Sequence, residues 1–206
     1  MSFPLAESSS SVDTGQPQER VPTNTLLTAW TARRSGLLPL VLFLFAGVAA
    51  WLTLIAVNNI TDFGTNRVLL ERTMTMRALI DDQVRGNGLE WRALPASLAT
   101  PALITVIVYQ LGTVVLMWRA VITGLRVLRS PRRGLAELIR HVNHSLVAFV
   151  GLFLGFLVSG LWFGYWMHLG PVQQVHFTLL MVGALVALLT NLLPVAARPL
   201  VPEVTR

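Results

Sequence analysis

Four long apolar runs, set apart by more polar segments, dominate the pattern of this chain. They lie at residues 36–57, 101–123, 146–167 and 175–195. Each run has about 20 residues, the length at which an α-helix crosses the hydrocarbon of a bilayer. The pattern therefore predicts an all-α fold, a transmembrane bundle of four helices that occupies residues 36–196.

The two ends of the chain lack such runs. Residues 1–35 are polar, with four consecutive serines and several prolines, and such a segment buries too little apolar surface to offset the entropy lost on ordering. We interpret it as a flexible tail, and residues 197–206 as a second, short tail. The first apolar run is longer than the core of a signal peptide, which favours an uncleaved membrane helix.

The segment 58–100 is the longest one between two runs. Its first part, residues 58–66, is dense in Asn, Asp, Thr and Gly, the residues that favour turns and helix caps. Asp62 or Thr65 is placed to cap a helix. We expect one or two short amphipathic helices in this segment, packed on the bundle.

The charges between the runs predict an orientation. The link 124–145 carries five arginines against one acid, whereas the segment 58–100 balances five arginines with five acids. Basic residues gather on the cytoplasmic side of a membrane. An even number of spans then places the link 124–145 and both termini inside, and the segment 58–100 outside.

The composition narrows the classes of function. The chain is 53% hydrophobic and 13% charged, and it contains no cysteine, which excludes disulfides, thiolate metal sites and thiol nucleophiles. Its net charge is +6, and all of its basic residues other than histidine are arginines. We assign this charge to contacts with anionic lipid headgroups and expect no nucleic acid as a partner. The candidate headgroup ligands are Arg126, Arg129, Arg132, Arg133 and Arg140.

Small residues recur at four-residue spacing in the last two runs. They are Gly151, Gly155, Ser159, Gly160 and Gly164 in the third run, and Gly183, Ala187 and Asn191 in the fourth. Such faces let helix backbones approach closely in lipid. Two interpretations stay open: packing between these two helices, or docking onto the helix of a partner protein or of a second copy.

Polar side chains inside the runs are rare. Gln110 lies near the middle of the second run, where an amide seeks a partner on another helix; a contact with a ligand is the alternative. No acidic or basic residue lies deep in a run, which argues against a proton or ion pump. Trp118, Trp162, Tyr165 and Trp166 lie near the ends of runs, as is typical of anchors at the membrane interface.

The histidines raise the question of a cofactor. His168 and His176 flank the short turn between the last two runs, and they are the pair closest to the matched depth that a bis-histidine haem requires. His141 and His144 precede the third run. Histidines that contact solvent or headgroups are the simpler interpretation, so we expect no cofactor.

Several motifs resemble a known family. They are Asn59, Thr61, Asp62, Thr65 and Asn66 after the first run, and Trp91-Arg92 before the second. With Gly155-Phe156 and Gly164-Tyr165-Trp166, they make the chain similar to a bacterial family of small integral membrane proteins, domain of unknown function 2165. Two positions depart from the family pattern: Gln110 stands where a glutamate is usual, and Tyr165 where an acid often follows the glycine. The resemblance implies a location in the bacterial inner membrane and carries no activity.

These observations lead to three hypotheses of function. The first is a non-catalytic accessory or scaffold subunit of a membrane complex, because no nucleotide-binding, metalloprotease or hydrolase motif occurs. The second is a membrane anchor that binds haem or quinone near His168 and His176. The third is a transporter or channel component for a small neutral solute, with Tyr109, Gln110 and Thr113 on a polar cavity.

Overall fold

The computed structural model describes residues 36–82, 88–130 and 134–196. Within these ranges the chain is helical and contains no strand, which confirms the all-α fold. The long helices are α2 (Leu37–Thr61), α5 (Ala99–Arg129), α6 (Leu135–Trp162) and α7 (Gly170–Ala196). Shorter ones are α3 (Phe63–Met74), α4 (Arg77–Ile80), η1 (Glu90–Arg92), η2 (Ala96–Leu98) and η3 (Tyr165–Met167).

The four long helices are each apolar and long enough to cross a membrane, which confirms the predicted number of spans. They extend beyond the apolar runs, because α5 continues to Arg129 and α6 begins at Leu135. The link 124–145 is therefore mostly helix. Arg126 and Arg129 lie in the last turn of α5, where a positive charge stabilises the helix dipole. The predicted tails, together with Arg132 and Arg133, lie outside the described residues.

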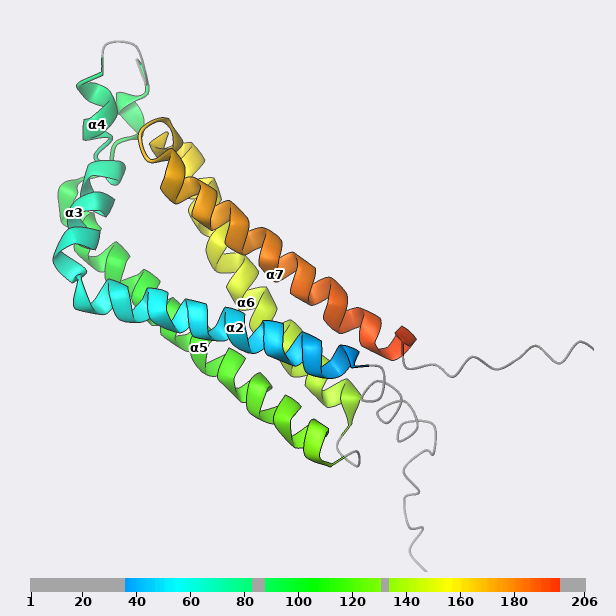
Figure 1. The fold of residues 1–206 in the computed structure, drawn as a ribbon. Helices are drawn as coiled ribbons and strands as arrows, with labels where there is room; N and C mark the ends of the chain where they lie inside the picture. Colours follow the sequence, from blue (N-terminus) through cyan, green and yellow to red (C-terminus); the bar gives the residue numbers. More distant parts are fainter. Residues whose placement is uncertain (1–35, 83–87, 131–133, 197–206) are drawn as a thin grey trace, which may run out of the picture.

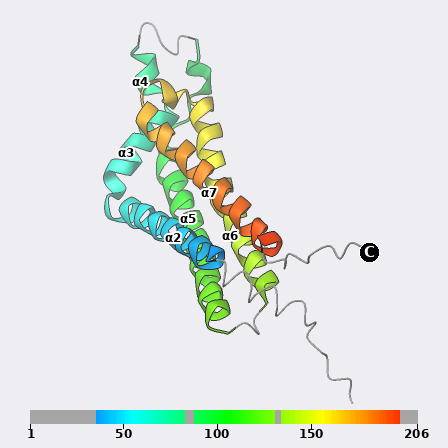
Figure 2. The ribbon, with the colours of Figure 1, turned by 45° about the vertical axis from the view of Figure 1, so that its right-hand side comes forward.

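The helices pack as neighbours in chain order, and α2 also contacts α7 (Figures 1 and 2). One face of each helix points into a shared core that contains Phe45, Met117, Phe149 and Leu179. The opposite faces are apolar too: Phe43, on α2, is 77% exposed. An apolar exterior around an apolar core is what a lipid solvent requires.

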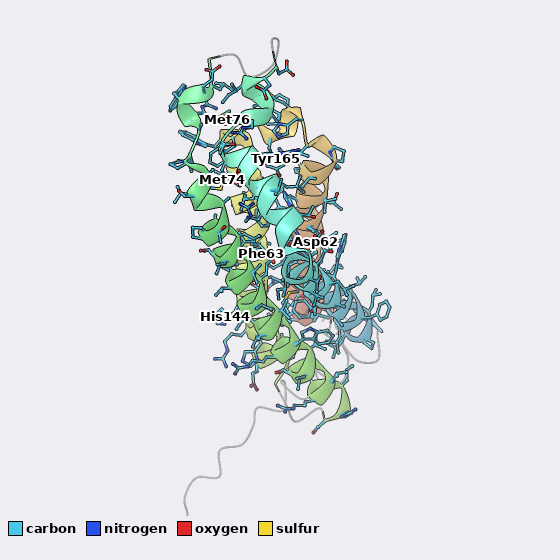
Figure 3. The ribbon with its side chains drawn as sticks, turned by 90° about the vertical axis from the view of Figure 1, so that its left-hand side faces the viewer. Asp62, Phe63, Met74, Met76, His144 and Tyr165 are labelled. Atoms are coloured by element: carbon cyan, nitrogen blue, oxygen red, sulfur yellow. The ribbon has the colours of Figure 1, made fainter. Side chains whose placement is uncertain are left out.

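The chain bends sharply between α2 and α3. Asp62, with φ −111° and ψ 44°, breaks the helix, and its side chain makes no capping hydrogen bond. Next to the bend, Asn59 Nδ2 donates to Gln110 Oε1 at 2.9 Å. This bond holds the bend against the middle of α5, and Figure 3 shows Asp62 and Phe63 between Tyr165 and His144 along the long axis.

The helix α3 therefore runs along the first part of α5 instead of lying across the end of the bundle (Figures 1 and 2). The sequence predicted a short helix packed on the bundle. It did not predict that this helix, α3, starts beside the middle of α5. The physical reason is the amide pair, which anchors the residues just before the bend to the interior of α5.

The end of the bundle beyond α3 is closed by tight contacts. Met76 adopts a positive φ of 52° and is buried, and Leu94 N donates to Met74 O at 2.8 Å. Gly164, at φ 62°, lies against Leu79, whose Cδ1 would be 2.9 Å from an added Cβ. These contacts join α4 to the turn between α6 and α7, and the stretch before η2 to the end of α3.

Candidate functional site

A cavity of about 550 Å³ lies between α3, α5, α6 and the beginning of α7. Its volume is within the range of pockets that hold small molecules. Most of its wall is apolar, with Leu69, Leu70 and Met74 from α3 facing Leu152 and Phe156 from α6. It occupies the half of the bundle in which α3 has replaced α2 as the neighbour of α5.

The cavity exists because the helix face opposite α3 carries small residues. Gly151, Gly155 and Ser159 of α6 all line it. A Cβ added at Gly155 would meet no atom within 4 Å. Of these residues, singled out as a helix-packing or partner face, Gly155 borders empty space, whereas a Cβ at Gly151 would lie 3.3 Å from the Tyr109 hydroxyl. Docking of a partner there stays a prediction.

The other small residues have different surroundings. A Cβ at Gly160 would overlap the ring of Tyr165, and one at Gly183 would lie 3.0 Å from the Phe149 ring. Ala187 packs against the core. Gly160 therefore allows the turn between α6 and α7 to pack closely against α6, and Gly183 allows α7 to pack closely against α6.

One side of the cavity is open to the surroundings of the bundle. Among its lining residues, Thr105, Tyr109, Gly151 and Gly155 are exposed. Tyr109 is ten residues into α5, or about 15 Å along the helix axis. The opening is therefore on the flank of a membrane helix bundle, where the neighbouring solvent is lipid.

A phenol–imidazole pair forms the main polar feature of the cavity. The Tyr165 hydroxyl lies 2.7 Å from His176 Nδ1. Tyr165 is in the turn between the two spans, and burial raises the pKa of its phenol to about 12, so that the proton is retained. The His176 ring stacks on Phe156, with centroids 4.6 Å apart and planes 24° apart.

The remaining hydroxyls of the cavity donate to the protein backbone. Thr73 bonds to Leu69 O, Thr105 to Pro101 O, Ser159 to Phe156 O and Tyr109 to Ala148 O, at 2.9, 2.9, 3.2 and 3.1 Å. None of the lining side chains in the described part of the chain is charged. The cavity thus offers few hydrogen bonds to a ligand and no counter-charge.

We call residues 58–66 together with Gln110 the polar elbow. Gln110 is 1% exposed and is bonded to Asn59. Asn66 Nδ2 donates to Asp62 O at 2.9 Å, and the Asn66 side chain reaches the cavity wall. Asp62 and Thr65 are exposed. The elbow gathers the first motif of the family pattern at one bend, where Asp62 takes the N-cap position of α3 without a side-chain bond.

The second motif of the family pattern forms a cluster with the end of α6. The Arg92 guanidinium lies 5.2 Å from the ring centroids of both Trp91 and Trp162. Arg92 Nη1 also donates to Trp162 O at 3.3 Å. The positive charge therefore stands at the C-terminal end of α6, where the helix dipole favours it.

The geometry gives the haem hypothesis no support. His176 already bonds Tyr165 and stacks on Phe156, and His168 directly follows η3. A haem bound by these two histidines stays an untested alternative to the expectation of no cofactor.

The structure agrees only in part with the residues expected for a transporter or channel of a small neutral solute. Tyr109 lines the cavity, but neither Gln110 nor Thr113 is among its lining residues. Gln110 instead bonds to Asn59, and Thr113 donates to Tyr109 O. The expectation that Gln110 seeks a partner on another helix agrees with this geometry.

The arginines of the link lie far from the cavity along the helices. Arg126, Arg129 and Arg140 are exposed near the ends of α5 and α6 that the link joins. The cavity begins at Gly151 on α6, eleven residues beyond Arg140. Their contact with headgroups stays a prediction.

Two features were missed in the sequence. Asn143 and Asn191 exchange reciprocal amide hydrogen bonds of 3.0 Å each between α6 and α7, and the Tyr165–His176 pair joins the turn to α7. An asparagine near the end of each of two successive apolar runs was the available signal for the first. The Tyr165–His176 pair could be recognised only from the structure, because it depends on the Tyr165 ring lying against Gly160, where a larger residue would overlap it.

Comparisons with known proteins bear on the family alone. The model of the family described as "Predicted small integral membrane protein (DUF2165)" matches residues 38–193. Comparison with curated proteins and with solved structures finds no match. The matched range contains the second and third spans, nearly all of the first and fourth, the polar elbow, the Trp91–Arg92 cluster and the whole cavity lining. The chain therefore belongs to the DUF2165 family of small integral membrane proteins.

Proposed function

We propose that the protein is a non-catalytic membrane protein that binds a neutral, mainly apolar molecule taken from the bilayer. The observation that carries this proposal is the cavity of about 550 Å³ on the flank of the bundle, with an apolar wall and an open side. Lipid-soluble molecules have direct access to such an opening.

The cost of leaving the cavity empty favours a ligand. Apolar side chains that border a void lose dispersion contacts on one side. A Leu, Ile or Val at position 155 would fill part of the space without meeting an atom close to its Cβ. Glycine there keeps the space open, which lowers stability unless another molecule occupies it.

The chemistry of the wall favours binding over catalysis. A nucleophile requires a neighbouring base that activates it. The Thr73, Thr105 and Ser159 hydroxyls of the wall donate to their own helices instead. The Tyr165 hydroxyl does lie next to His176, but burial raises its pKa to about 12, which disfavours the phenolate that would act as a nucleophile. The accessory role that the sequence suggested is compatible with this proposal, since a bound lipid-like molecule can serve a complex as well as a lone protein.

The test compares two identical substitutions. Gly155→Leu places a large side chain in the cavity, whereas Gly47→Leu places one on α2, where an added Cβ also meets nothing within 4 Å. We expect the wild type and Gly47→Leu to retain co-purified neutral lipids in native mass spectrometry, and Gly155→Leu to lose them while folding normally.

Two outcomes would contradict the proposal. One is a wild-type protein that carries no neutral lipid and gains none when reconstituted with a total membrane extract. The other is a Gly155→Leu protein with the same bound lipids as Gly47→Leu. Helix content measured by circular dichroism confirms that both variants fold.

A further inference from the structure

The Tyr165–His176 pair gives the cavity a directed hydrogen-bond donor. The Tyr165 hydroxyl and His176 Nδ1 lie 2.7 Å apart, and in the tautomer in which the phenol donates to Nδ1 the imidazole proton is on Nε2. No described residue hydrogen-bonds to this Nε2, and His176 is part of the cavity wall. In that tautomer the bond to Tyr165 orients the imidazole ring, and Nε2–H is the donor that a ligand in the cavity can reach.

The same histidine belongs to a rigid aromatic surface. Its ring is stacked on Phe156, with centroids 4.6 Å apart, and it lies 6.1 Å from the Phe153 ring. Planar rings pack well against such surfaces in offset or edge-on arrangements. The donor thus stands beside a wall that suits a flat molecule.

The lining also excludes charged ligands. None of its side chains within the described ranges is charged, and an ionised carboxylate or phosphate without a partner is costly in apolar surroundings. Fatty acids and phospholipid headgroups therefore do not fit. A flat, neutral ring with a hydrogen-bond acceptor does.

We propose that the ligand is a membrane quinone, whose ring carbonyl accepts a hydrogen bond from His176 Nε2. The ring packs near Phe156, and the apolar tail leaves through the open side beside Gly155. The inference rests on the proposed function and adds the chemical class of the ligand. It concerns binding alone and requires no electron transfer.

Three probes with the same tail separate the hydrogen bond from apolar binding. They are a decyl-substituted benzoquinone, which only accepts hydrogen bonds, decylbenzene, which makes none, and 4-decylphenol, which also donates one. Apparent affinities come from the ligand-induced rise in unfolding temperature of the full chain in detergent. The wild type should bind the quinone roughly threefold to tenfold more tightly than decylbenzene, which is the value of one net hydrogen bond.

Three variants test whether the preference for the quinone over decylbenzene depends on the Tyr165–His176 pair. His176→Phe keeps a ring against Phe156 and should bind quinone and decylbenzene equally. Tyr165→Phe keeps the ring that packs on Gly160 and should reduce the preference, because it frees the imidazole tautomer. Gly155→Leu should weaken binding of all three probes.

The outcomes distinguish this inference from the proposed function. If no probe binds to the wild type, both fail. If the wild type binds quinone and decylbenzene equally, or if His176→Phe keeps the preference, apolar binding stands and the quinone assignment is wrong. A clear preference for 4-decylphenol would indicate a hydroxylated lipid instead and would also overturn it.

Discussion

Single hydrogen bonds between helices determine the geometry of this protein at the scale of residues. Asn59–Gln110 joins α2 to α5, Tyr109–Ala148 joins α5 to α6, and the Asn143–Asn191 pair joins α6 to α7. In lipid no hydrophobic force selects one helix face over another. Each bond therefore helps to fix which faces meet.

The Asn59–Gln110 bond can be tested by a double-mutant cycle. Gln110→Leu and Asn59→Leu should each lower the free energy of unfolding by about 1 kcal/mol, because each leaves an amide without its partner in apolar surroundings. The double variant should lose no more than either single one. Denaturant-induced unfolding in mixed micelles measures all three.

The exposed Gln174 of α7 provides the control. Gln174→Leu should leave the unfolding free energy unchanged, since no described residue bonds to its side chain. Losses at positions 59 and 110 that simply add would show that the two amides act independently, contrary to the geometry.

At the scale of elements, the bend between α2 and α3 has the largest consequence. It allows α3 to replace α2 beside α5, and the space between α3 and the small residues of α6 becomes the cavity. The segment 58–100 between the first two spans is also attached near its far end, where Arg92 lies between Trp91 and Trp162. The segment is thus held at its start by the elbow and at its end by this cluster.

Removing the Arg92 guanidinium should release the stretch 88–98 from α6. Each cation–π contact at a partly exposed site contributes about 0.5–1 kcal/mol, so Arg92→Ala should speed amide hydrogen exchange in this stretch roughly fivefold or more. Arg77→Ala, which removes an exposed arginine of α4, should leave exchange there unchanged. Equal protection in both variants would show that the cluster does not hold the segment.

At the scale of the whole molecule, the hydropathy of the sequence predicts the long helices and their order along the chain. It does not predict the cavity. The apolar runs predicted four spans because a lipid solvent demands them. The cavity depends on which faces of α3 and α6 meet, and that depends on bonds such as Asn59–Gln110 between residues 51 positions apart. The glycines at 151 and 155 signalled a special face, but their spacing alone does not distinguish a packed face from an open one.

The predicted orientation can be tested without a background of native thiols, because the chain has no cysteine. Ala136→Cys lies at the arginine-rich end and Ile80→Cys at the α4 end, both exposed. If the arginines determine topology, an impermeant maleimide added to intact cells should label position 80 and not position 136. The reverse pattern would contradict the predicted orientation, and labelling only after lysis at both positions would do so as well.

The flank opening of the cavity sets how a ligand would be supplied. A molecule that enters from the hydrocarbon never has to dissolve in water, so its occupancy follows its mole fraction in the membrane and not its aqueous concentration. Diluting proteoliposomes with buffer should leave occupancy unchanged, whereas fusing them with empty vesicles should lower it. A site of this kind senses the composition of the membrane around it.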